Sequence, residues 1–201
     1  MNRILLFSIL CSIAIFSCGS DDTSEPENAK TTYGQFEVQA NNSIVMEGDI
    51  TSITSVDLQE LINDHPNANP IIMKSCSGVH LDEATLVAAR LVRSAQLDTH
   101  LASDGTISRG GVNFFIAGVN RSMDSGGQIG VNAWKDDSGR EATSYDFGDE
   151  AHLKYLNFYA EMGFQWLAAS DFYYFSIQAA DSDNLFFLTD DLIEDYALLT
   201  D

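Results

Sequence analysis

The sequence predicts an α/β domain built on a mainly parallel sheet, with ββα units first and a helical part toward the C-terminus. Short apolar runs typical of buried strands alternate with helical segments of about 10 to 15 residues, a pattern that βαβ crossovers produce. The composition is 45% hydrophobic and 10% aromatic, which is enough to fill a core in a chain of 201 residues. We find no internal repeat and no linker after residue 36, so we expect one folded domain.

The expected elements follow one another along the chain. Strands are predicted at residues 36–38, 44–46, 70–73, 97–101 and 128–134, and residues 185–188 form a short apolar segment. Helices are predicted at residues 55–64, with Ser55 as the N-cap, and at 82–94, 151–162 and 172–180. The segment 112–119 follows a glycine pair, and 192–196 closes the chain. The segment 82–94 has acidic residues at its start and arginines near its end, as the helix dipole favours.

The charge balance excludes two classes of partner. The chain has 10 Lys and Arg against 30 Asp and Glu, a formal net charge of -20. A nucleic-acid-binding protein needs a basic face to displace the counterions of the phosphates. Binding to anionic lipid through a basic patch is not expected either, because acidic residues outnumber basic ones three to one. We therefore expect no nucleic acid as a partner.

The N-terminus predicts a lipid anchor. Residues 1–17 carry a positive charge near their start, at Arg3. An apolar run follows that is too short to span a membrane, as in a secretory signal peptide. The run ends in Ile15-Phe16-Ser17-Cys18, which resembles the lipobox of bacterial lipoproteins, where the cysteine carries the lipid. The alternative is an ordinary leader with a chance cysteine at position 18.

The residues after Cys18 are interpreted as a tether. Residues 18–35 are small, polar and acidic and are expected to be flexible, which places the folded domain at residues 36–201. The pair Asp21-Asp22 resembles the surface-export signal of Bacteroidota lipoproteins. We expect the protein in the cell envelope, anchored to the outer membrane. The domain could lie on the cell surface or on the periplasmic side of that membrane. Once the leader is removed and Cys18 is lipidated, Cys76 is the remaining thiol, so we expect no internal disulfide.

Several segments together resemble one family. They are residues 75–84 (SCSGVHLDEA), 97–100 (LDTH), 110–118 (GGVNFFIAG), 130–134 (GVNAW), 187–189 (FLT) and 196–201 (YALLTD). In this combination the chain resembles the ClpP-like periplasmic serine-protease relatives of the ClpP/crotonase superfamily. The resemblance implies the ClpP/crotonase-like fold and a Ser–His–carboxylate site that attacks a carbonyl. Members of that superfamily often oligomerise, so a homo-oligomer is a possible assembly.

The catalytic positions that the resemblance implies carry other residues here. The family's nucleophilic serine precedes the glycine pair, where this chain has Arg109, and its histidine base follows Gly-Val, where this chain has Asn132. A guanidinium is not a nucleophile, and a carboxamide does not accept a proton near neutral pH. Gly78 and Val79 match the oxyanion loop, and Asp181 lies near the place of the orienting carboxylate, with Asp183 as a rival.

Three functions remain open at this point. The first is a non-catalytic domain, a pseudoenzyme kept for binding an unknown protein or peptide or for assembly. The second is an active peptidase or esterase that uses Ser108 or Cys76 with His152. The third is a small-anion binding protein that uses Arg109, although Arg109 could instead pair with Asp181 and plug the site. No spacing of His, Cys or Glu matches a metal site, and no cofactor is expected.

Overall fold

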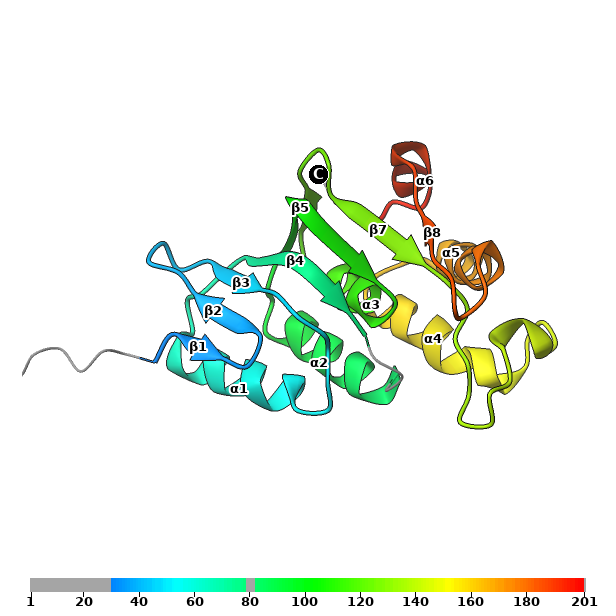
Figure 1. The fold of residues 1–201 in the computed structure, drawn as a ribbon, viewed down its shortest axis with the longest axis horizontal. Helices are drawn as coiled ribbons and strands as arrows, with labels where there is room; N and C mark the ends of the chain where they lie inside the picture. Colours follow the sequence, from blue (N-terminus) through cyan, green and yellow to red (C-terminus); the bar gives the residue numbers. More distant parts are fainter. Residues whose placement is uncertain (1–29, 79–81, 201) are drawn as a thin grey trace, which may run out of the picture.

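The computed structural model describes residues 30–78 and 82–200. Its strands form an eight-stranded mixed sheet in the order β1-β2-β3-β4-β5-β7-β8, with β6 also paired to β5 (Figure 1). The pairs β3/β4, β4/β5, β5/β6 and β5/β7 are parallel, whereas the outer pairs are antiparallel. The strands are β1 Thr32–Tyr33, β2 Phe36–Val38, β3 Ile44–Met46, β4 Ile71–Ser77, β5 Thr99–Ser108, β6 Arg121–Met123, β7 Gln128–Val131 and β8 Phe186–Phe187. The predicted α/β class with a mainly parallel sheet is confirmed.

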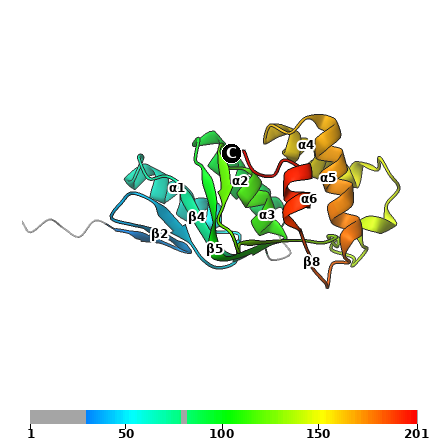
Figure 2. The same cartoon turned by 90° about the horizontal axis from the view of Figure 1, so that it is seen from above.

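The helices form one layer on the sheet and a separate group beyond its β7 end. Seen from above, α1, α2 and α3 lie along one face of the sheet, and α4, α5 and α6 gather past β7 and β8 (Figure 2). The bounds are α1 Thr54–Asp64, α2 Asp82–Ser94, α3 Gly110–Ile116, α4 Glu150–Glu161, α5 Trp166–Ala179 and α6 Asp190–Asp195, with a 3₁₀ turn η1 at Ala142–Ser144. No helix within the described ranges has the length and apolar character to cross a membrane.

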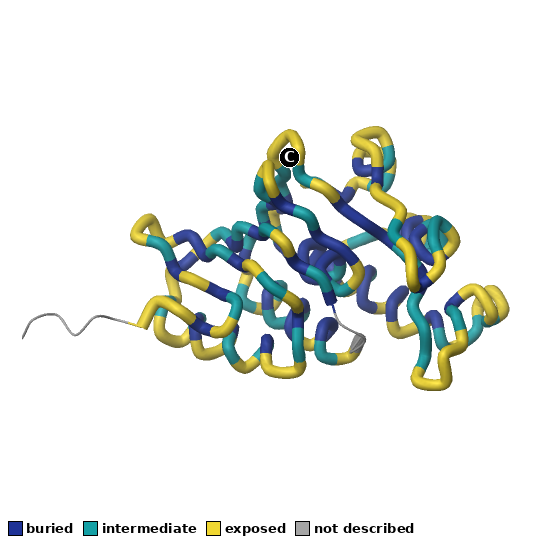
Figure 3. Tube along the Cα trace, viewed as in Figure 1, coloured by how far each residue is buried: buried dark blue, intermediate teal, exposed yellow. Residues whose placement is uncertain are grey.

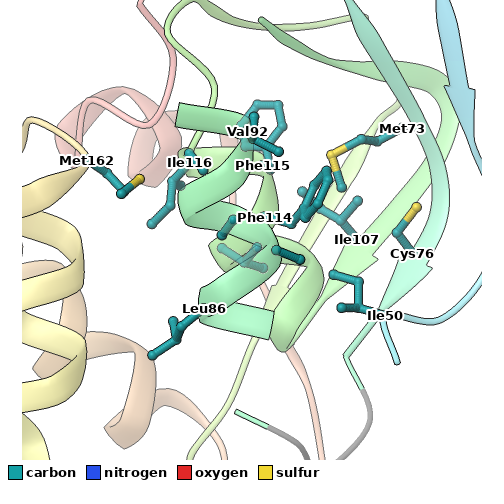
Figure 4. Packing of buried hydrophobic residues seen from close by; sticks show 14 of the residues in the cluster. Ile50, Met73, Cys76, Leu86, Val92, Ile107, Phe114, Phe115, Ile116 and Met162 are labelled. Carbon is teal, nitrogen blue, oxygen red and sulfur yellow. The ribbon is translucent and has the colours of Figure 1, made fainter. Parts of the chain in front are cut away.

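The core lies between the central strands and the layer of helices. Buried segments concentrate in β4, β5, β7 and α3, and exposed ones mark the rim of the molecule (Figure 3). Phe114 of α3 lies beside Ile107 of β5 and Met73 of β4, all fully buried (Figure 4). Burial of such side chains stabilises the fold by roughly 1.5 to 3 kcal/mol each. This packing fixes α3 against the strand ends that precede the candidate site.

β5 is the strand that organises the centre of the sheet. Its first residues pair with β6 (Thr99 with Arg121), and its last residues pair with β7 (Ser108 with Gly130). On its other edge both of its ends pair with β4, and the register shift between Met73 and Ser75 leaves residues 102–105 of β5 outside this pairing. The carboxyl ends of β4, β5 and β7 therefore meet at one place, where loops of parallel sheets commonly hold functional residues.

The folded part begins earlier than the sequence indicated. Tyr33 in β1 is buried, and its hydroxyl donates to the Lys30 carbonyl at 3.0 Å and to Asp64 at 2.8 Å. Residues 32–35 therefore belong to the domain and not to the tether 18–35, because one aromatic side chain anchors an otherwise polar segment. The predicted signal peptide, Cys18 and most of the predicted tether lie outside the described residues.

Two helix predictions also need correction. Ser55 is not the N-cap of α1: the helix begins at Thr54, whose hydroxyl accepts from the Thr51 backbone N–H at 2.9 Å and tightens the turn before it. α5 begins at Trp166, six positions before the predicted start at Phe172. The apolar pattern concealed this first part because Trp166 and Leu167 are exposed on the helix surface.

Candidate functional site

Arg109 lies on a tight turn between β5 and α3. Its backbone has φ 52° and ψ -123°, in a region that non-glycine residues rarely adopt. The glycine pair that follows makes this turn possible. A Cβ on Gly111 would lie 2.3 Å from the Cys76 carbonyl oxygen, and one on Gly110 would lie 2.7 Å from Thr85 Oγ1. The turn therefore holds Arg109 at the meeting point of β4, β5 and α3.

Arg109 and Asn132 converge on one backbone oxygen. The Ser182 carbonyl accepts from Arg109 Nη2 at 3.3 Å and from Asn132 Nδ2 at 2.9 Å. The two residues that the sequence resemblance assigns to the nucleophile and base positions thus donate to the same backbone oxygen. Both side chains act there as hydrogen-bond donors.

The loop that carries Ser182 is held by Glu141 and Lys135. Ser182 Oγ donates to Glu141 Oε1 at 2.7 Å, and Lys135 Nζ lies 3.3 Å from the same oxygen. Lys135 also pairs with Asp183 at 2.9 Å. Mainly through the hydrogen bond to Asp183, these carboxylates raise the pKa of Lys135, so it remains protonated. Asp183 is therefore engaged by Lys135.

Asp181 does not take the place of an orienting carboxylate, which corrects the expectation from the sequence. Its Oδ1 accepts from the backbone N–H groups of Asp183 and Asn184 at 3.1 and 3.0 Å, so it caps its own turn. It is exposed, and no described carboxylate forms an ion pair with Arg109. The polar atom presented to Asn132 and Arg109 is the carbonyl of the next residue, Ser182.

The three residues considered as substitutes for the catalytic pair have other partners. Ser108 is buried, and its hydroxyl donates to Ser77 Oγ at 3.2 Å. The Cys76 thiol donates to the Met46 carbonyl at 3.4 Å, and burial raises its pKa to about 12. A thiol with such a pKa is protonated near neutral pH and unreactive.

His152 of α4 lies inside a cluster of aromatic side chains. Its Nδ1 is 2.7 Å from the Tyr173 hydroxyl, which also accepts from Trp134 Nε1 at 2.9 Å. The rings of Tyr145 and Tyr174 pack against the imidazole, and the residue is 1% exposed. The structure brings His152 to Tyr173, and no hydrogen bond among the described residues joins it to Ser108 or Cys76.

Gly78 lies where the oxyanion loop was expected. It forms a bridge with Ile50, and a Cβ on it would lie 2.5 Å from Gly110 Cα. Only a glycine permits this approach between the end of β4 and the start of α3. Val79, the other residue assigned to this loop, lies outside the described residues.

A cavity of about 370 Å³ opens between this turn and the helices beyond β7. Its polar end carries Arg109, Asn132 and Ser182, and its walls include Tyr155 and Tyr159 of α4 with Phe172 and Tyr173 of α5. Sequence reasoning missed Ser182, Lys135 and the α4 tyrosines, because no motif marks a backbone carbonyl or a cavity wall. No group of three potential metal ligands occurs among the residues the structure describes.

Comparisons with known proteins give similar folds among solved structures only. No family model matches the sequence, and no curated protein matches it. Among solved structures, a mutant of the 1510-N membrane-bound stomatin-specific protease in complex with a substrate peptide has a TM-score of 0.51 and 15% identity, covering 78% of this chain and 71% of that chain. A second mutant of that protease has a TM-score of 0.52 and 15% identity, covering 78% and 75%. A mutant of ClpP1 from Listeria monocytogenes has a TM-score of 0.51 and 16% identity, covering 79% and 88%. The chain has a ClpP-like fold.

Proposed function

We propose that this chain is a non-catalytic ClpP-like protein, a pseudoenzyme whose pocket at the former catalytic position binds a ligand or partner without cleaving it. The observation that carries the proposal is the convergence of Arg109 and Asn132 on the Ser182 carbonyl. A serine nucleophile and a histidine base would have to stand at these two positions to cut a peptide or ester bond.

The surroundings of the site support the same proposal. A nucleophile needs a base within hydrogen-bond reach. Ser108 is instead bonded to Ser77, and Cys76 is a buried, protonated thiol. The pocket itself is large enough for a small ligand, because ligand sites usually start near 300 Å³. A binding role uses this pocket and needs no reacting group.

A fluorophosphonate probe tests the loss of catalysis. We expect no covalent labelling of the full chain purified in detergent, because no serine hydroxyl among the described pocket residues lies within hydrogen-bond reach of a histidine. The matched control is the double variant Arg109→Ser with Asn132→His, which returns a hydroxyl and an imidazole to the same positions on the same backbone. Labelling of the natural chain that disappears in Ser108→Ala would refute the proposal and favour an active hydrolase. The corresponding result for Cys76 would come from an iodoacetamide probe and Cys76→Ala.

We also propose that a lipid on Cys18 anchors the protein to the outer membrane of a bacterial cell envelope, at its surface or its periplasmic face. The sequence Ile15-Phe16-Ser17-Cys18 supports this proposal. Metabolic labelling with a palmitate analogue should mark the natural chain and not Cys18→Ser, whereas Cys76→Ser keeps the label. Protease treatment of intact cells then distinguishes the two faces. An unlabelled natural chain would contradict the anchor.

A further inference from the structure

The cavity has one polar end and an apolar body. Arg109, Asn132 and Ser182 gather at the end formed by the β5–α3 turn and the loop after α5. Tyr155, Tyr159, Phe172 and Tyr173 form aromatic walls beside this end, each at most 5% exposed, and smaller polar side chains complete the lining. A ligand that fits this distribution has a single polar head and an aromatic or aliphatic body.

No described carboxylate pairs with the cation at the polar end. Within the described residues, the guanidinium of Arg109 makes one hydrogen bond, 3.3 Å to the Ser182 carbonyl. A guanidinium has five N–H donors. The structure thus contradicts a plug formed by Arg109 and Asp181.

The charges around the cavity match a monoanion. The other cation of the lining, Lys135, is already paired with Glu141 and Asp183. The one acid of the lining, Asp49, is exposed. Among the residues the structure describes, Arg109 therefore has no anionic partner, and Asn132 Nδ2 is a neutral donor beside it. A carboxylate accepts two parallel bonds from a guanidinium, whereas a phosphate dianion would leave a negative charge unmatched.

We propose that this pocket binds a small organic monocarboxylate with an apolar body, the carboxylate on Arg109 and Asn132 and the body between the aromatic residues of α4 and α5. This inference rests on the proposed non-catalytic binding function and names the chemical class of its ligand. The carboxylate accepts hydrogen bonds from Arg109 and Asn132, either in place of the Ser182 carbonyl or together with it. The aromatic walls select for an apolar body over a short, fully polar acid.

The test compares an acid with its uncharged amide. The ligands are 3-phenylpropionate and 3-phenylpropanamide, which have the same body and differ in the charge of the head group. Trp134 lines the cavity, and the chain has two tryptophans. A Trp166→Phe background therefore leaves Trp134 as the fluorescent reporter, and isothermal titration calorimetry on the natural chain provides an independent measurement.

We expect the acid to bind and the amide to bind at least about tenfold more weakly, as the loss of a charge-assisted bond requires. Arg109→Met should weaken binding of the acid by at least about tenfold, with an unchanged unfolding midpoint because Arg109 is exposed. Arg90→Met is the matched control: this exposed arginine on α2 lies outside the cavity lining, so binding should not change.

Each failure points to a different conclusion. Equal binding of acid and amide, or no binding of the acid at millimolar concentration, overturns the carboxylate inference and leaves the non-catalytic function standing. Equal affinity of Arg109→Met and the natural chain for the acid also overturns the inference. Covalent labelling of the natural chain by the fluorophosphonate probe overturns the proposed function instead, whatever the affinity for carboxylates.

Discussion

Replacing Tyr173 by Phe isolates the hydroxyl group at the centre of the aromatic cluster. This oxygen is the partner of Trp134 Nε1 at 2.9 Å and of His152 Nδ1 at 2.7 Å, and Tyr173 and His152 are both buried. The substitution retains the ring and leaves two polar groups without this partner. Each such group costs about 1 to 3 kcal/mol, so we expect the free energy of unfolding to fall by about 2 to 4 kcal/mol.

Urea unfolding followed by far-UV circular dichroism measures this change. The midpoint should fall while the m-value stays constant, because the folded and unfolded surfaces hardly change. Tyr174→Phe is the matched control: it is the neighbouring residue on α5, and its hydroxyl accepts a 3.2 Å bond from the Gly148 N–H in an exposed setting. The reasoning is refuted if Tyr173→Phe lowers the midpoint no more than Tyr174→Phe does.

Two further predictions concern ionisable groups. The Cys76 thiol, whose pKa burial raises to about 12, should resist iodoacetamide near pH 8 in the folded chain and react once urea unfolds it; mass spectrometry of the labelled peptide checks this, and rapid labelling of the folded chain contradicts it. Burial and the hydrogen bond to Asp64 raise the pKa of Tyr33 from 10.0 to about 12. Because the folded-state pKa lies above the unfolded one, this stability is fully present below about pH 10 and is lost as the pH rises toward 12. Tyr33→Phe should therefore flatten the decline of the urea midpoint over this range, and an unchanged slope would contradict the assignment.

The sequence predicted the order of strands and helices because each depends on local patterns. The helix at residues 82–94 has both an apolar period and charges suited to its ends, and α2 spans those residues. Gly110 and Gly111 lie at a close approach of backbones, where a Cβ on Gly111 would lie 2.3 Å from the Cys76 carbonyl oxygen. The place of Arg109 before α3 followed from the same pair.

The sequence could not predict the contacts that depend on distant parts of the chain. Ser182 lies 50 positions from Asn132, and its contribution is a backbone oxygen, which every residue type possesses. Counting back from residues 187–189 therefore selected Asp181, a neighbour whose carboxylate caps its own turn. His152 was chosen for its chemistry and its position after the strand. In the structure, its imidazole is instead buried against the rings of Tyr173 and Tyr174.

The turn at Arg109 has a consequence for protein engineering. Its backbone conformation, φ 52° and ψ -123°, is imposed by β5 before it and by the packing of Gly110 and Gly111 after it. A side chain introduced at position 109 would thus leave the backbone at the same point and enter the same end of an aromatic-walled cavity. β-branched residues are the least suitable there, since they tolerate positive φ poorly. Arg109→Cys, or an unnatural amino acid with a metal-chelating group, would turn this fold into a scaffold for artificial catalysts.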